Sequence, residues 1–236
     1  MKTICVIQSR LGSSRLPGKV LLPLGGKSML QNIVERLRQC KKIDEIVVAW
    51  PFNDFAEGMQ TGFDAEQYFY SGDENDLIGR FLACAKEYKA DWVVRVCSDN
   101  PVVEASMIDE LVDWKEILGP LFSTAEDPWR DHDGFGGEIY STELLDWMDK
   151  TIKCSEYREH PHKFWIKLLR YSYGGKRYPR GFRLDINTPR DYEKLSDIYD
   201  HFGHNQFSAR EALKYLETHM EERNISAGVG SDGQHL

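Results

Sequence analysis

The chain has 236 residues, a formal net charge of −8 at pH 7 and five cysteines. The negative charge argues against general nucleic-acid binding, which needs a basic surface to displace counterions. The cysteines lack CxxC or CxH spacing, so neither a zinc site nor a disulfide framework is predicted. No segment approaches the roughly 18 apolar residues needed to span a bilayer, and we expect a cytoplasmic protein with no membrane or nucleic-acid partner.

The charge is unevenly distributed along the chain. Residues 1–42 hold nine Lys or Arg and one acid, Glu35, a balance of +8, so the remaining residues carry −16. This asymmetry predicts an anion-binding segment near the N-terminus. A solvated basic helix face at Arg36, Arg38, Lys41 and Lys42 is the alternative explanation.

Apolar strands alternate with amphipathic helices along the chain. Thr3–Gln8 is apolar on both faces, as in a central strand, and Ser28 is placed to cap a helix with Leu30, Ile33, Val34 and Leu37 on one side. Further strands are predicted at Ile43–Trp50, Gln67–Tyr70, Trp92–Cys97, Pro120–Thr124, Glu138–Tyr140 and Phe182–Ile186. Further helices are predicted at Asp76–Lys89, Ser106–Glu116, Thr142–Lys150, Glu156–Leu169, from Thr188–Pro189 onward and at Ser208–Arg223.

This alternation predicts an α/β fold, a three-layer α/β/α sandwich with a mostly parallel central sheet. We expect a single domain over residues 1–223 and a disordered tail over 224–236, where Gly and Ser accumulate. Ala125–Gly137 is expected to be a long loop that covers the substrate.

The most informative segment is Gln8–Lys19, which directly follows the first strand. It combines Gly12 and Gly18 with three Ser and with the cations Arg10, Arg15 and Lys19. Loops at the carboxyl ends of parallel strands present backbone N–H groups to ligands, and these cations suit a polyphosphate and a pyrophosphate leaving group. The segment predicts a triphosphate site; an ordinary basic surface loop is the alternative.

This loop resembles the signature of the sugar-activating cytidylyltransferases. The similarity is strongest to the spore-coat-polysaccharide branch of the acylneuraminate and 3-deoxy-manno-octulosonate cytidylyltransferase superfamily, and it spans about residues 1–200. Later segments follow the order of that branch: Gly72–Arg80, Arg95–Pro101, Asp133–Glu138, Arg158–His160 and Arg183–Asp191. The resemblance implies a nucleotide-diphospho-sugar transferase-like fold, CTP and Mg²⁺ as ligands, transfer of CMP to a sugar-type acceptor, and a possible homodimer.

Candidate metal ligands lie at two places. Asp99 follows the strand Trp92–Cys97, at the carboxyl edge of the sheet, and suits Mg²⁺, which prefers oxygen ligands; by resemblance it matches the family's metal-binding aspartate. Its alternative role is to cap a turn. The family's second aspartate is Asn187 in this chain, and Asp185 is the candidate substitute on the same strand face. A helix-entry Asn187 and a surface Asp185 would be the structural alternative.

The resemblance also implies nucleotide and acceptor contacts. The nucleotide residues are Gln8, Ser9, Leu11, Gly12 and Ser13 in the first loop, with Ser71 and Gly72 at the base and ribose. Asp76 and Arg80 are equally consistent with a structural i,i+4 ion pair. The acceptor side comprises Arg158, Glu159 and His160 together with the loop Asp131–Glu138, where Gly136 replaces a family aspartate. His162 is expected to be an exposed, solvated histidine.

We therefore predict a CTP-dependent nucleotidyltransferase of polysaccharide or glycoconjugate biosynthesis, with Arg10, Arg15, Lys19 and Asp99 as catalytic residues. The acceptor would be an acidic sugar, a sugar phosphate or a polyol phosphate. Two alternatives remain open. One is a glycosyltransferase of related fold, and the other is a catalytically weakened nucleotide-binding paralogue, which Asn187 and Gly136 favour.

Overall fold

A computed structural model describes residues 1–60, 65–118, 122–124, 134–168 and 183–228. A six-stranded sheet forms its centre, in the order β5-β4-β1-β6-β8-β7. The strands are β1 (Thr3–Gln8), β4 (Glu45–Pro51), β5 (Glu66–Tyr70), β6 (Trp92–Cys97), β7 (Phe122–Thr124) and β8 (Glu138–Ser141). The first four in the order pair in parallel, and β8 is antiparallel to both its neighbours. The predicted mostly parallel sheet is confirmed.

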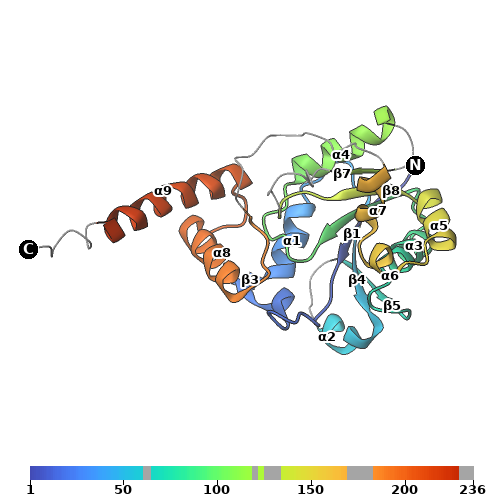
Figure 1. Ribbon diagram of the computed structural model, residues 1–236, viewed down its shortest axis with the longest axis horizontal. Helices are drawn as coiled ribbons and strands as arrows, with labels where there is room; N and C mark the ends of the chain where they lie inside the picture. Colours follow the sequence, from blue (N-terminus) through green and yellow to red (C-terminus); the bar gives the residue numbers. More distant parts are fainter. Residues whose placement is uncertain (61–64, 119–121, 125–133, 169–182, 229–236) are drawn as a thin grey trace, which may run out of the picture.

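Helices cover both faces of the sheet (Figure 1). Cys5 and Ile7 of β1 face α1 (Met29–Leu37), α4 (Ala105–Leu118), α8 (Pro189–Phe202) and α9 (Ala209–Gly228). Ile4 and Val6 face α3 (Leu77–Glu87) and α5 (Thr142–Thr151), with α6 (Ser155–Glu159) and α7 (Pro161–Leu168) beside them. Because successive strand residues point to opposite faces, a strand buried on both sides must be apolar throughout. The three-layer prediction is confirmed.

Short elements connect this framework. They are η1 (Lys19–Leu21), β2 (Pro23–Leu24), β3 (Lys27–Ser28), η2 (Phe52–Asp54) and α2 (Phe55–Met59). The helix caps follow the sequence signals. Ser28 accepts a hydrogen bond from Gln31 N at the start of α1, and Thr188 caps α8 with Pro189 in its first turn.

Two predicted elements differ from the structure. The helix predicted at Glu156–Leu169 is divided between α6 and α7, because Pro161 has no N–H and forces His160 out of helical geometry (φ −128°, ψ 73°). The strand predicted at Phe182–Ile186 is reduced to a bridge at Arg183. Ile186 N instead donates to Asp99 O (2.8 Å), so this segment pairs with a loop of the active-site edge.

The last helix is longer than predicted. Helix α9 continues to Gly228, past the expected domain end at Arg223, and its far part projects from the body (Figure 1). Residues 229–236, and most of the loop predicted at Ala125–Gly137, lie outside the described residues. Within the part of the chain that the structure describes, no helix combines the length and apolarity needed to cross a membrane.

Candidate active site

Asp54 and Arg80 anchor the loop after β1, and neither was predicted to do so. Asp54 accepts a hydrogen bond from Leu11 N (2.8 Å). Arg80 is buried and donates to the carbonyl oxygens of Ser9 (3.2 Å) and Glu74 (2.5 Å). Arg80 therefore joins the loop to the segment that precedes α3, which is a structural role distinct from the ion pair considered for it.

The loop folds on itself and leaves some backbone groups available. Ser13 N and Gly18 N both donate to Leu11 O, and Gly18 takes a left-handed conformation (φ 66°) that favours glycine. Among the described residues, the N–H groups of Gly12, Ser14 and Arg15 have no hydrogen-bond partner. Such groups at a strand end are suited to phosphate oxygens.

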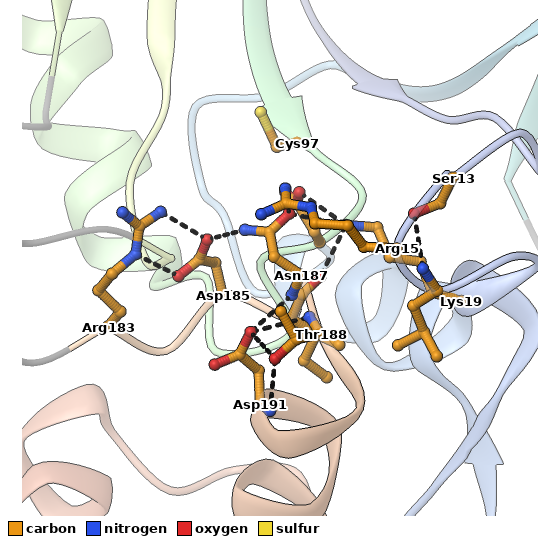
Figure 2. Close-up of polar contacts among 12 residues, drawn as sticks. Ser13, Arg15, Lys19, Cys97, Arg183, Asp185, Asn187, Thr188 and Asp191 are labelled. Carbon is orange, nitrogen blue, oxygen red and sulfur yellow. Dashed lines mark hydrogen bonds and ion pairs between the residues drawn. The ribbon is translucent and has the colours of Figure 1, made fainter.

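Lys19 brings the two predicted metal-binding segments together. Its side chain is almost buried, and its Nζ donates to Asp99 Oδ2 (3.0 Å), Ile186 O (2.6 Å) and Asn187 Oδ1 (3.3 Å). Arg15 also donates to Asn187 Oδ1, at 3.0 Å. Figure 2 shows Arg15 and Asn187 facing each other from the loop and from the segment before α8. Residues far apart in the sequence thus form one site.

The amide of Asn187 has a defined orientation. Its oxygen accepts from Arg15 and Lys19, while its Nδ2 donates to Asp185 Oδ2. Only the oxygen can accept and only the nitrogen can donate, so the charged neighbours fix which atom faces the loop. The carboxylate of Asp185 is buried and also binds Arg183 (2.8 Å), as Figure 2 shows.

This arrangement shows how the predicted metal ligands lie relative to one another. Asp99 Oδ2 and Asn187 Oδ1 converge on one point, which Lys19 Nζ holds, and two oxygens of this kind fit a magnesium ion that takes its other ligands from phosphates and water. Asp185 does not point there, because its oxygens face Arg183 and Asn187 Nδ2. In this structure Asp185 orients Asn187, and its role as a direct metal ligand stays a prediction. Among the described residues, no three His, Cys, Asp or Glu side chains are grouped as a metal site.

The capping box of α8 holds Asn187 in place. Asp191 Oδ2 accepts from Asn187 N (3.2 Å) and Thr188 N (2.8 Å), and Thr188 Oγ1 accepts from Asp191 N. Burial raises the pKa of Asp191, but these hydrogen bonds outweigh it and leave the pKa below its ordinary value. The start of α8 thereby positions a residue of the site.

The predicted nucleoside contacts border the same edge. Arg10 donates to Asn75 Oδ1 (3.1 Å), which directs it to the segment containing Ser71 and Gly72, and both of these residues are exposed. Gln8 is half-buried at the end of β1, and its Oε1 accepts from Arg95 Nε (2.9 Å). Gln8 is therefore held by a buried arginine of the neighbouring strand.

The predicted acceptor arginine is occupied by the protein. Arg158 donates from Nε and Nη2 to the two oxygens of Asp76 (2.9 and 2.7 Å), and it also binds Asp149 Oδ1 (2.6 Å). Its hydrogen bonds to Asp76 raise its pKa. Arg158 thereby ties α6, and with it Glu159 and His160, to the start of α3. Its role in substrate binding stays a prediction.

His162 departs most from its expected state. Its ring lies 5.9 Å from that of His160, and its Nδ1 is buried 3.3 Å from Glu138 Oε1. The histidine expected to be solvated is therefore packed against a buried carboxylate. The sequence offered only one signal for this, namely that His162 follows the proline that starts α7.

Comparison with known proteins identifies the family to which this site belongs. The profile of the Cytidylyltransferase family matches residues 4–223. The chain belongs to the cytidylyltransferase family. The matched segment contains all of β1 except its first residue, the loop after β1 and the other described strands of the sheet.

Individual relatives extend the comparison. A cytidylyltransferase structure from Leptospira borgpetersenii is 29% identical, covers 100% of both chains and has a TM-score of 0.81. The spore coat polysaccharide biosynthesis protein SpsF of Bacillus subtilis is 27% identical over 89% of this chain and 92% of its own length. A structure of CMP:2-keto-3-deoxy-manno-octonic acid synthetase complexed with CTP shares the fold (TM-score 0.64, 18% identity, 85% and 99% covered).

Proposed function

We propose that this cytidylyltransferase transfers CMP from CTP to a sugar-type acceptor and releases pyrophosphate. The observation that carries the proposal is the convergence of Arg15 and Lys19 with Asp99 and Asn187 at the carboxyl edge of the sheet. Open α/β sheets bind nucleotides at this edge. The same fold in the synthetase named above is complexed with CTP.

The residues of the site have complementary roles in this reaction. Arg10, Arg15 and Lys19 neutralise the triphosphate and stabilise charge on the departing pyrophosphate, aided by the N–H groups of Gly12, Ser14 and Arg15. Lys19 can exchange its contact with Asp99 for a phosphate oxygen as the nucleotide enters. An acceptor hydroxyl or phosphate attacks the α-phosphorus in line, so no covalent nucleophile of the protein is required.

Asp99 and Asn187 would hold Mg²⁺, which when bound supplies positive charge to the phosphate oxygens. Because they offer one carboxylate and one amide oxygen, we expect the protein alone to bind the ion weakly. The nucleotide would provide further oxygen ligands. Asp185 keeps the amide oxygen of Asn187 turned to this position.

The acceptor class follows from the relatives. SpsF is named for spore coat polysaccharide biosynthesis, and the synthetase for a sugar acid. We propose a role in surface polysaccharide or glycoconjugate synthesis, with an acidic sugar, a sugar phosphate or a polyol phosphate as acceptor. The predicted cytoplasmic location and homodimer belong to the same proposal.

A nucleotide screen tests this function. CTP with Mg²⁺ should raise the melting temperature more than ATP, GTP or UTP, because a ligand that binds only the native state stabilises it. Pyrophosphate release should then be measured with CTP and 3-deoxy-manno-octulosonate, glucose 1-phosphate or glycerol 3-phosphate. Equal or larger shifts with ATP would overturn the assignment to CTP, and pyrophosphate release distinguishes this enzyme from a glycosyltransferase.

Asn187 favours a second candidate, a paralogue that binds nucleotide with little turnover. An amide replaces a charged metal ligand of the resembling enzymes, and Lys19 holds the position between the two oxygen ligands. Calorimetry that shows CTP binding, without pyrophosphate release across the three acceptors, would support this candidate.

A further inference from the structure

A buried polar cluster lies beside the strand ends of the site, and phosphate transfer makes no use of it. It consists of Arg95, Glu138, Tyr140 and His162, named here the Glu138 cluster. Glu138 is 4% exposed; its Oε1 accepts from Arg95 Nη1 (2.7 Å) and its Oε2 from Tyr140 Oη (2.5 Å). Burial raises the pKa of Glu138, but the Arg95 guanidinium holds it below the ordinary value, so the carboxylate is ionised at neutral pH.

Stability alone does not account for this cluster. A buried ion pair usually gives no net gain over well-packed apolar side chains, because both charges must be desolvated. Arg95 also donates to Gln8 Oε1 (2.9 Å) and contacts Cys97 Sγ (3.1 Å), at the ends of β1 and β6. Asp99 lies two residues after Cys97, in the loop that follows β6. The cluster is therefore continuous with the nucleotide site.

His162 presents one edge of its ring to this cluster and the other to solvent. Its Nδ1 is buried 3.3 Å from Glu138 Oε1, without an aligned hydrogen bond, and has no other partner among the described residues. The side chain is nevertheless 27% exposed, and Nδ1, but not Nε2, is a buried atom without a hydrogen-bond partner, from which we infer that Nε2 faces outward. A carboxylate beside Nδ1 favours the tautomer with hydrogen on Nδ1, which leaves a lone pair on Nε2.

The charges around the ring favour its neutral form. Burial lowers the pKa of His162, Glu138 of β8 raises it in part, and Arg95 of β6 with His160 and Lys163 lowers it further. Arg95 and Arg158 are both paired within the protein, and Lys163 binds Glu156 (3.2 Å). With its described neighbours paired in this way, the His162 ring is neutral and can accept a hydrogen bond.

We propose that His162 contacts the acceptor sugar and accepts a hydrogen bond from one of its hydroxyl groups through Nε2. Glu138, held by Arg95 and Tyr140, is the positioning residue that sets the tautomer. The inference rests on the proposed function and deepens it. It specifies that a hydroxylated part of the acceptor, as opposed to its carboxylate or phosphate, lies between the start of α7 and the start of β8.

Histidine-ring NMR on the full chain tests the contact without requiring turnover. His162 should show hydrogen on Nδ1 at pH 7. Saturating 3-deoxy-manno-octulosonate, glucose 1-phosphate or glycerol 3-phosphate, added singly to the CMP-bound protein, should shift the Nε2 resonance for the probe that binds. An Nε2 resonance that no probe moves, or an unprotonated Nδ1, overturns the inference. The thermal shift with CTP tests the proposed function separately.

Steady-state kinetics with the same acceptor then distinguish a direct contact of His162 with the acceptor from a purely structural role of this side chain. His162→Phe should raise the KM for the acceptor by about tenfold while the KM for CTP stays within about twofold. His162→Gln should recover most of the loss, since its amide oxygen can accept a hydrogen bond near the Nε2 position. His201→Phe, an exposed histidine of α8, is the matched control. Equal losses in His162→Phe and His162→Gln, or a parallel rise in the KM for CTP, would contradict the contact.

Discussion

At the scale of single residues, Lys19 joins the segments that form the candidate site. Its ammonium group contacts Asp99, the Ile186 carbonyl and Asn187, which come from the loop after β6 and from the segment before α8. A lysine places its charge at a point, whereas an arginine spreads it over a planar fork. Because three acceptors surround Nζ, position 19 requires a side chain of suitable shape as well as a positive charge.

Lys19→Ala should lower turnover by at least about tenfold, because the departing pyrophosphate loses a cation. Lys19→Arg should also be impaired, since its larger group cannot fit the same three oxygens. Pyrophosphate release over a range of CTP concentrations measures kcat and kcat/KM for both variants. Lys27→Ala, which removes an exposed lysine paired with Glu35, is the control and should retain full activity. An unchanged kcat/KM in Lys19→Ala would show that the loop is not the triphosphate site.

Asn187→Asp tests the effect of having an amide where the resembling enzymes have an aspartate. The new carboxylate would lie beside Asp185, where Nδ2 now donates, so the two negative charges should repel each other in the absence of metal. We expect a lower melting temperature without Mg²⁺ and a lower Mg²⁺ concentration for half-maximal rate.

Asp99→Asn should nearly abolish turnover. Near-normal activity of Asp99→Asn at limiting Mg²⁺ would mean that the metal site lies elsewhere.

At the scale of elements, the start of α8 links helix stability to the site. Thr188 caps the helix, and Asp191 binds the backbone N–H of Asn187 in the same capping box. Helix α5 has a comparable cap, because Ser141 accepts from Leu144 N, but it lies at the far end of β8 from Glu138. Removing each cap in turn therefore distinguishes a loss of helix stability from a loss of activity.

Thr188→Ala should lower the free energy of unfolding by about 1 kcal/mol, which is typical for loss of an N-cap. It should also reduce turnover, because Asn187 loses part of its support. Ser141→Ala should cost a similar amount of stability and leave kcat unchanged. Urea unfolding and pyrophosphate release measure the two quantities, and equal activity in both variants would remove the proposed link.

At the scale of the whole molecule, buried ionisable groups predict loss of stability in acid. Burial is the largest cause that lowers the pKa of His160 and of His162 below the ordinary value of about 6.5. The unfolded chain therefore binds protons first as the pH falls, and stability should decline from about pH 6.5 downward. Glu138 and Asp76 have lowered pKa values, so their contributions are lost in a second, more acid stage.

Urea midpoints between pH 7.5 and pH 5 should show this first stage. His162→Gln should flatten the slope, because the replaced side chain has no proton to gain. His201→Gln should leave the slope as it is in the unchanged protein. If His162→Gln shows the same slope as the unchanged protein, the buried histidine does not contribute to acid sensitivity.

The sequence by itself determined the layered α/β fold, most helix and strand positions, the helix caps and the position of the glycine- and cation-rich loop after β1. These features depend on local signals: apolar periodicity, Ser28 and Thr188 as caps, and glycines interleaved with cations after β1. The tertiary structure decided which charges are paired. Arg158 is bound by Asp76 at the start of α3, and His162 is packed against Glu138, because α6 meets α3 and α7 meets β8 only once the chain is folded. Such contacts join residues distant in sequence, and no local pattern encodes them.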